Sequence, residues 1–343
     1  MKPLVAWQPP MRRVLYALVP LVAASVWFFG WRALVVVAVV NLAAFLTEFA
    51  FTRFTKAETT SAVFVTGTLL GLSLPPTIPI WIAVVGAVFG VFFGKMVFGG
   101  FGRNVFNPAL VGRIFIYVSF AVPMNARWAE PITSSTGSLA FPWGVGGFAR
   151  WASDALTGAT PLRFLREGKP VDLLPLLWGN VAGSIGETSA VVILLGGLYI
   201  IWKKAANWRI VVSECAAFIV LQGIFWLADV RHATDPLTAL LSGSVMLGMF
   251  FMATDPVSAA QTQGGRWIYG ALVGALTVLI RTFSIWPEGT MFAILLGNTF
   301  APITDWLIRQ RQQQRKAATA AGAAVAPGGS ADAAAAPPAG GTP

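Results

Sequence analysis

The sequence predicts an all-α protein that crosses a membrane many times. Apolar residues make up 56% of the 343-residue chain and charged residues only 11%, against about a quarter in soluble proteins. Long apolar runs recur along the whole chain, as polytopic membrane proteins require. One cysteine and one histidine are too few for a disulfide framework or a zinc, haem or iron–sulfur site. The composition therefore argues against a soluble enzyme, a disordered protein and a metal centre.

Ten segments are candidate membrane spans, each near the length of about 20 residues that a bilayer requires. They are 14–30, 33–51, 61–74, 80–98, 106–121, 187–202, 210–228, 236–252, 267–283 and 289–308. The third contains Gly67, Gly71 and the Pro75–Pro76 pair, and the fifth carries Arg113. We therefore expect these two to be the least continuous helices.

The Lys and Arg residues indicate the orientation, because they concentrate on cytoplasmic loops. With both termini in the cytoplasm, most of them, Lys95 included, fall on that side and few on the short outer loops. The net charge of +10 then reflects these loops and not a nucleic-acid partner. The predicted organisation is a cytoplasmic N-terminus, a first five-helix half, an outer segment, a second five-helix half and a disordered Ala/Gly/Pro tail, at 1–13, 14–121, 122–186, 187–312 and 313–343.

Three short strings recur in the same order in the two halves. The pairs are Thr66-Gly-Thr with Ser242-Gly-Ser, Gly86-Ala-Val-x-Gly90 with Gly270-Ala-Leu-x-Gly274, and Asn104-Val-Phe-Asn-Pro108 with Asn298-Thr-Phe-Ala-Pro302. A repeat of five spans is odd, so we expect the second half to be inverted relative to the first. Inverted repeats with discontinuous helices are a transporter architecture. A passive channel or carrier without a flavin therefore stays open as an alternative, as does a scaffold for other subunits.

The string Asp154-Ala-Leu-Thr-Gly-Ala-Thr-Pro161 lies in the outer segment. Gly158 and Ala159 leave the hydroxyl of Thr160 accessible to a bulky partner, and Pro161 stiffens the chain after it. From the residues alone, an ordinary exposed turn is the simplest interpretation.

The same string resembles the acceptor sequence of flavin transferases, Asp-x-x-[Ser/Thr]-Gly-Ala-Thr, in which FMN is joined through its phosphate to the last threonine. Further strings resemble the NqrB/RnfD family, whose members are membrane subunits of the sodium-translocating NADH:quinone oxidoreductase (Nqr) and of the related Rnf complex. They are Phe98-Gly-Gly-Phe-Gly-Arg-Asn-Val-Phe-Asn-Pro-Ala-Leu110, Gly183-Ser-Ile-Gly-Glu-Thr-Ser189, Met252-Ala-Thr-Asp-Pro-Val-Ser-Ala259 and Pro287-Glu-Gly-Thr-Met-Phe-Ala293. The resemblance covers most of the chain.

The resemblance implies a component of a redox-driven ion translocase that is not active alone. It implies FMN on Thr160, within a string that also contains Asp154, Thr157, Gly158 and Ala159, and a bound riboflavin. It further implies a second FMN-bearing subunit, iron–sulfur subunits, a maturing flavin transferase and a bacterial inner membrane with the flavin on the outer face. Nqr versus Rnf, Na⁺ versus H⁺, and quinone versus ferredoxin stay open.

Two further groups of residues have a structural and a functional interpretation. Gly99 and Gly100 suit a tight reversal between helices, and the resemblance places the quinone region there. Asp255 stands in an Ala-Thr-Asp-Pro string that also occurs at 233–236, a pattern typical of helix N-caps. The resemblance points to Asp255 and Asp305 in cation uptake, and Asp305 lies in no local capping pattern.

Glu48 and Glu214 lie within predicted spans, where acids are functional candidates by default. The alternative interpretations are that the side chain extends to the membrane interface, or that it pairs with a nearby cation, Arg53 or Arg209.

Ser184-Ile-Gly-Glu187 has the spacing of a capping box ahead of the sixth span. Arg113 and Arg281 suit the neutralisation of either a flavin phosphate or an intramembrane acid. The sequence does not choose between these two targets.

Overall fold

The fold was analysed in a computed structural model. It describes residues 4–132, 146–154, 156–157, 159–230, 233–286 and 288–325, with 320–325 described by their backbone alone. Of the predicted site residues, Gly158 lies outside the described residues.

Each of the ten predicted spans contains helical structure, which confirms the all-α polytopic fold. The first half holds α1 (Pro9–Phe29), α2 (Trp31–Thr55), α3 (Ala62–Leu72), α4 (Ile80–Val91) with the π-helical turn η1 (Phe92–Met96), and α5 (Pro108–Ser119). The second half holds α10 (Ala190–Trp202), α11 (Trp208–Leu227), α12 (Pro236–Leu241), α13 (Val245–Leu247) with the π-helical turn η3 (Gly248–Met252), α14 (Gln263–Phe283) and α15 (Thr290–Val325). Helices α1, α2, α11, α14 and α15 are long and apolar enough to cross a membrane.

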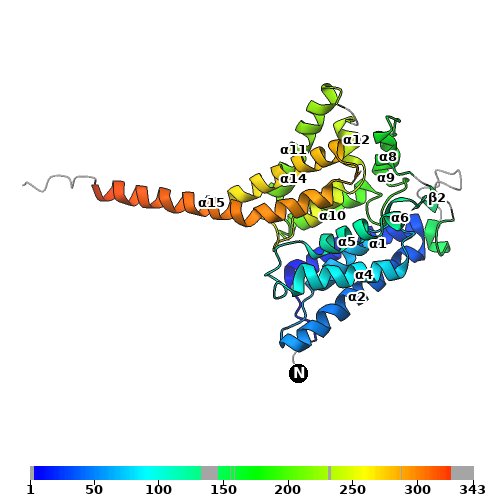
Figure 1. Cartoon of the computed structure of the whole chain (residues 1–343), viewed down its shortest axis with the longest axis horizontal. Coiled ribbons are helices and arrows are strands. Elements are labelled where there is room, and N and C mark those ends of the chain that lie inside the picture. Colours follow the sequence, from blue (N-terminus) through cyan, green and yellow to red (C-terminus); the bar gives the residue numbers. More distant parts are fainter. Residues whose placement is uncertain are drawn as a thin grey trace, which may run out of the picture.

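The two halves pack their helices in the same order. In the first half α2 packs against α3 and α4, and α4 packs against α5. In the second half α11 packs against α12 and α14, and α14 packs against α15. Helices α1 and α10, the first of each half, contact each other. In Figure 1 the first half fills the lower part of the molecule and the second half the upper part.

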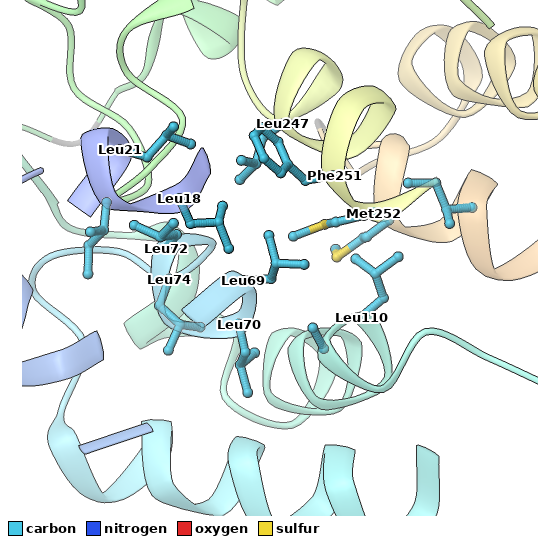
Figure 2. Close-up of a cluster of buried hydrophobic side chains, with 14 of the residues drawn as sticks. Leu18, Leu21, Leu69, Leu70, Leu72, Leu74, Leu110, Leu247, Phe251 and Met252 are labelled. Atoms are coloured by element: carbon cyan, nitrogen blue, oxygen red, sulfur yellow. The ribbon is translucent and has the colours of Figure 1, made fainter. Parts of the chain in front are cut away.

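The core lies where the halves meet. Figure 2 shows leucines of α1, α3 and α5 facing Leu247, Phe251 and Met252 of α13 and η3. All of these side chains are buried. Because each is almost fully removed from solvent and lipid, the halves form one continuous core.

Helix breaks fall in the third and eighth spans. Helix α3 ends at Leu72, shortly before Pro75 and Pro76. The eighth span breaks between α12 and α13, where Gly243 has a φ of 66°. The internal repeat pairs this Ser242-Gly-Ser string with the one at 66–68, which is continuous helix in α3. The repeat therefore marks corresponding helices but not the same local conformation.

The segment between the halves contains short elements. They are α6 (Ala121–Asn125), β1 (Trp128–Ala129), the 3₁₀ turn η2 (Gly146–Ala149), β2 (Leu156–Thr157), α8 (Pro161–Arg166) and α9 (Leu173–Trp178). Strands β1 and β2 pair antiparallel, with Trp128 opposite Thr157. In Figure 1, β2, α8 and α9 gather at one end of the molecule, and α15 projects from the other. We call these ends the Thr160 face and the α15 face.

Two helices extend beyond the predicted spans. Helix α1 begins at Pro9, within the predicted cytoplasmic N-terminus 1–13, because proline is well suited to a first helical turn. Helix α15 continues to Val325, well into the expected disordered tail 313–343. The residues after 308 are mainly Gln, Arg, Lys and Ala, which are strong helix formers.

Candidate functional site

Thr160 lies at the junction between the β1–β2 pair and helix α8. Its backbone is extended, with φ of −102° and ψ of 164°, and Pro161 takes the first helical position. Thr160 thus occupies the N-cap position, yet its side chain makes no capping hydrogen bond. Buried Leu162 and Leu165 anchor α8 to the body. The fold therefore holds a partly buried threonine whose hydroxyl the helix does not use.

The rest of the acceptor string surrounds this threonine on the Thr160 face. Asp154 is exposed. The Thr157 hydroxyl accepts a hydrogen bond from the Ala159 N–H at 3.3 Å. Thr160 also lines a narrow cleft whose other walls include Trp128, Gly183, Ser184, Thr188, Gly243 and two acids, Glu187 and Glu288.

Arg113 joins the two halves beneath this cleft. From α5 it donates to Glu187 at 2.8 Å and to Glu288 through a second short contact. All three residues are buried. Of the two targets that the sequence left open, Arg113 thus neutralises protein acids. The positive charge of this buried guanidinium is already balanced by two carboxylates, so we do not assign a flavin phosphate to it.

Arg281 is also buried, but it has no acid within salt-bridge distance among the described residues. It donates to the Ala239 carbonyl at 2.9 Å and the Ser242 carbonyl at 3.0 Å, both at the break after α12. These carbonyls lack helical partners because the helix stops there. Arg281 therefore stabilises the broken helix.

On the α15 face, the loop after η1 makes the predicted reversal. Gly99, Gly100 and Gly102 have φ values of 99°, 94° and 88°, a region that residues with a Cβ rarely adopt. The structural interpretation of these glycines is therefore supported. Gly99 and Gly100 also line a cavity, which they share with Glu48 and Arg103.

Glu48 and Lys95 form a buried ion pair at this cavity. Lys95 Nζ on η1 lies 2.6 Å from Glu48 Oε2 on α2. Glu48 Oε1 accepts from both the N–H and the hydroxyl of Thr60, each at 3.0 Å. The alternative pairing of Glu48 with Arg53 is therefore wrong. Lys95 does not lie on the surface of a loop, because its side chain turns into the protein and the residue is only 1% exposed.

A second cavity lies between the halves on the same face. Lys95, Asn104 and Asn107 contribute from the first half, and Asp255 and Phe251 from the second. Both π-helical turns reach it, since Lys95 belongs to η1 and Phe251 to η3. Such turns are frequent at functional sites. The Asn107 side chain caps α5 and donates to the Met252 carbonyl at 3.2 Å, so it joins the two halves.

The carboxylates of Asp255 and Asp305 accept hydrogen bonds from backbone N–H groups and from hydroxyl groups. Asp255 accepts from the Val257 N–H at 3.2 Å and the Ser258 hydroxyl at 2.8 Å. The helix N-cap expected at Asp255 is nevertheless wrong, because residues 256–258 form a turn and the next helix, α14, begins at Gln263. Burial raises the pKa of Asp255, and these hydrogen bonds oppose the rise. Asp305 accepts from the backbone N–H groups of Gln261 and Thr262, at 2.6 and 2.9 Å. It therefore supports the cap of α14 from a distant position in the sequence, because it holds Thr262, whose hydroxyl accepts from the Gly265 N–H at 3.1 Å.

The capping box expected at Ser184–Glu187 is wrong. Helix α10 begins at Ala190, and Ser189 accepts from the Val192 N–H at 3.4 Å as its N-cap. Glu187 instead binds Arg113. Sequence reasoning missed Lys95 and Glu288 as site residues. The available signal was a charged residue within or beside an apolar span, since such residues rarely stand unpaired.

The chain is similar to known proteins over almost its whole length. The model of the NQR2, RnfD, RnfE family matches residues 5–314. The RnfD component of the ion-translocating oxidoreductase complex of Shigella dysenteriae serotype 1 (strain Sd197) is 36% identical over 326 residues, covering 88% of this chain and 92% of that protein. The same components of Escherichia coli strain SE11 and of E. coli O157:H7 are 36% and 35% identical over the same shares.

Proposed function

This chain belongs to the NQR2, RnfD, RnfE family, and we propose that it is the membrane subunit of an Nqr/Rnf-type ion-translocating redox complex. In this proposal it carries FMN as a phosphoester on Thr160 and passes electrons across the membrane, coupled to the movement of Na⁺ or H⁺. The relatives are named as components of an ion-translocating oxidoreductase complex. Partner subunits therefore belong to the proposal, including a second FMN-bearing subunit and iron–sulfur subunits.

The geometry of Thr160 is the observation that carries the flavin assignment. A flavin transferase needs an accessible hydroxyl in a defined turn, and Thr160 offers one that caps no helix. Trp128 and Gly243 line the cleft beside it. FMN bound there would supply one-electron redox chemistry, while α8 and the β1–β2 pair would fix its position.

The α15 face supplies the remaining candidate sites. The cavity between the halves combines apolar walls with the polar side chains of Lys95 and Asp255, and we assign riboflavin to it. The cavity at Gly99 and Gly100 suits a quinone head group. Asp255 lines the cavity between the halves and is the stronger candidate for cation coupling. Asp305 would combine that role with its cap on α14.

The proposed orientation puts the Thr160 face outside a bacterial inner membrane and both termini in the cytoplasm. Its support is the excess of basic residues at the α15 face, where α15 carries Arg309, Arg311 and Arg315 on exposed surface. Cytoplasmic segments of membrane proteins are enriched in such residues.

Thr160→Ala tests the flavin assignment directly. The chain is co-expressed with a flavin transferase, separated on a denaturing gel and viewed under ultraviolet light. We expect fluorescence at the mass of the wild-type chain and none in the variant, because only a covalently attached flavin stays with the denatured chain. Thr188→Ala is the matched control, since it removes a threonine hydroxyl from the same cleft but outside the acceptor string.

A dark wild-type band, with the transferase active on another acceptor protein, would contradict the flavin assignment. The passive channel or carrier would then become the leading function. Fluorescence that persists in Thr160→Ala would show that another residue carries the flavin.

A further inference from the structure

Glu214 is the acid that the proposed function leaves unused. It lies in the second turn of α11, is 1% exposed, and neither of its carboxylate oxygens has a hydrogen-bond partner among the described residues. Helix α14 covers it through two glycines. A Cβ on Gly270 would lie 3.2 Å from the Glu214 nitrogen, and one on Gly274 would lie 3.1 Å from its carbonyl carbon. Helix α14 thus packs directly against the backbone of α11 at Glu214.

The nearest basic residues along α11 and α14 do not neutralise Glu214. The alternative partner, Arg209, stacks on the Trp208 ring at 4.8 Å. Arg266 donates to the Ala260 carbonyl at 3.3 Å. Among the described residues, no group of acids, histidines or cysteines surrounds Glu214 as a metal site would require.

The energetics favour a neutral acid. An ionised carboxylate that is buried without a partner costs several kcal/mol or more. Burying a neutral hydroxyl without a hydrogen bond costs about 1–3 kcal/mol. The smaller penalty decides the state, so the carboxyl of Glu214 holds its proton.

A cavity on the α15 face lies beside the first turn of α11, close to Glu214 along the chain. Ile210, Asp255 and Arg266 line that cavity. Ile210 is four residues before Glu214, so the two side chains lie on the same face of α11, one turn apart. We propose that Glu214 is a proton-binding site that carries an exchangeable proton as a neutral carboxylic acid and exchanges it through this cavity.

Other titratable groups near Glu214 are few. Tyr269 faces it from α14 and Cys215 adjoins it on α11. Helix α12 and turn η3, which also pack against α11, contain no titratable side chain. The Tyr269 hydroxyl is hydrogen-bonded to the Asn298 side chain at 2.8 Å. None of these groups provides a positive charge that would stabilise an ionised Glu214.

Infrared spectroscopy of the purified complex at neutral pH tests the proposal. The spectrum of Glu214→Gln is subtracted from that of the wild type. We expect the variant to lose an absorption of a protonated carboxyl group, and we expect that band to shift when the complex is transferred to D₂O. Glu48→Gln is the matched control, since that acid is paired with Lys95, and should lose carboxylate absorption instead.

Three results would overturn the proposal. Loss of carboxylate absorption in Glu214→Gln would show that the acid is ionised. A protonated band that does not shift in D₂O would show that the proton does not exchange. A protonated band that sodium chloride removes and potassium chloride does not, at one pH, would identify a sodium site.

The measurement does not depend on the flavin. It can be repeated in the Thr160→Ala background, so failure of the flavin assignment and failure of this inference are distinguishable. If Glu214→Gln does not assemble, Glu214→Asp retains an acid and should show a protonated band at a displaced frequency.

Discussion

Glu48 and Glu214 occupy corresponding helices, α2 in the first half and α11 in the second, yet only Glu48 has a cation. Lys95 reaches Glu48 because the π-helical turn η1 extends the α4 segment beside α2. In the second half, α14 packs on α11 through Gly270 and Gly274 and brings no basic side chain to Glu214. The same residue type on corresponding helices is therefore an ion pair in one half and a lone acid in the other.

The glycine strings of the repeat differ in a related way. Gly86 and Gly90 of α4 face α5, and a Cβ on Gly90 would lie 2.5 Å from the Pro108 carbonyl oxygen. Gly270 and Gly274 of α14 instead face α11. A shared small-residue string permits close helix packing, but the neighbouring helix decides which interface it serves.

The largest effect should come from breaking the ion pair. Lys95→Met leaves the Glu48 carboxylate buried with only its Thr60 hydrogen bonds, which should cost about 3–5 kcal/mol. The double variant Glu48→Gln/Lys95→Met should recover most of this loss. Thermal unfolding midpoints of the purified complex measure both, with Lys316→Met on exposed α15 as the surface control. A wild-type midpoint for Lys95→Met would show that the pair does not contribute to stability.

An intermediate effect should follow from filling the glycine contacts. Gly90→Ala and Gly274→Ala each place a methyl group against the backbone of a neighbouring helix, which should cost about 1–3 kcal/mol. Gly223→Ala is the control, because its Cβ would meet only Pro236 Cγ at 3.6 Å. Thermal unfolding should rank both tight-contact variants below it. If all three variants have the same thermal unfolding midpoint, the close helix packing in the two halves is not required for stability.

The smallest effect should come from the cap on α14. Asp305→Ala removes an acceptor from two backbone N–H groups and should cost about 1 kcal/mol. Helix α4, the counterpart of α14, begins at Ile80 after Pro79 without a side-chain cap and offers no equivalent loss. Asp305→Asn retains an acceptor oxygen but removes the charge. A loss of cation transport in Asp305→Asn at unchanged thermal stability would assign Asp305 to cation coupling as well as to capping.

Local features of the chain were predictable from the sequence. The apolar runs predicted all ten helical segments, since the length and apolarity of a segment decide whether it spans a bilayer. Asp235 was predicted as an N-cap, and it accepts a hydrogen bond from the Thr238 N–H of α12. Gly99 and Gly100 were predicted to form a reversal, and both have positive φ. In each case the residues that determine the feature are neighbours in the chain.

The tertiary structure decided which charged side chains pair with one another. Arg113 meets Glu187 and Glu288 from the other half, Lys95 meets Glu48, and Asp305 supports the cap of a helix that begins more than forty residues earlier. Helix α14 meets Glu214 with Gly270 and Gly274 and brings no cation to it. By itself the sequence determined which segments are apolar enough to enter a membrane, because the free energy of transferring a segment into the bilayer is summed over the residues of that segment. Only the packing of segments decided which buried charges are neutralised, because an ion pair requires two side chains to lie within a few ångströms.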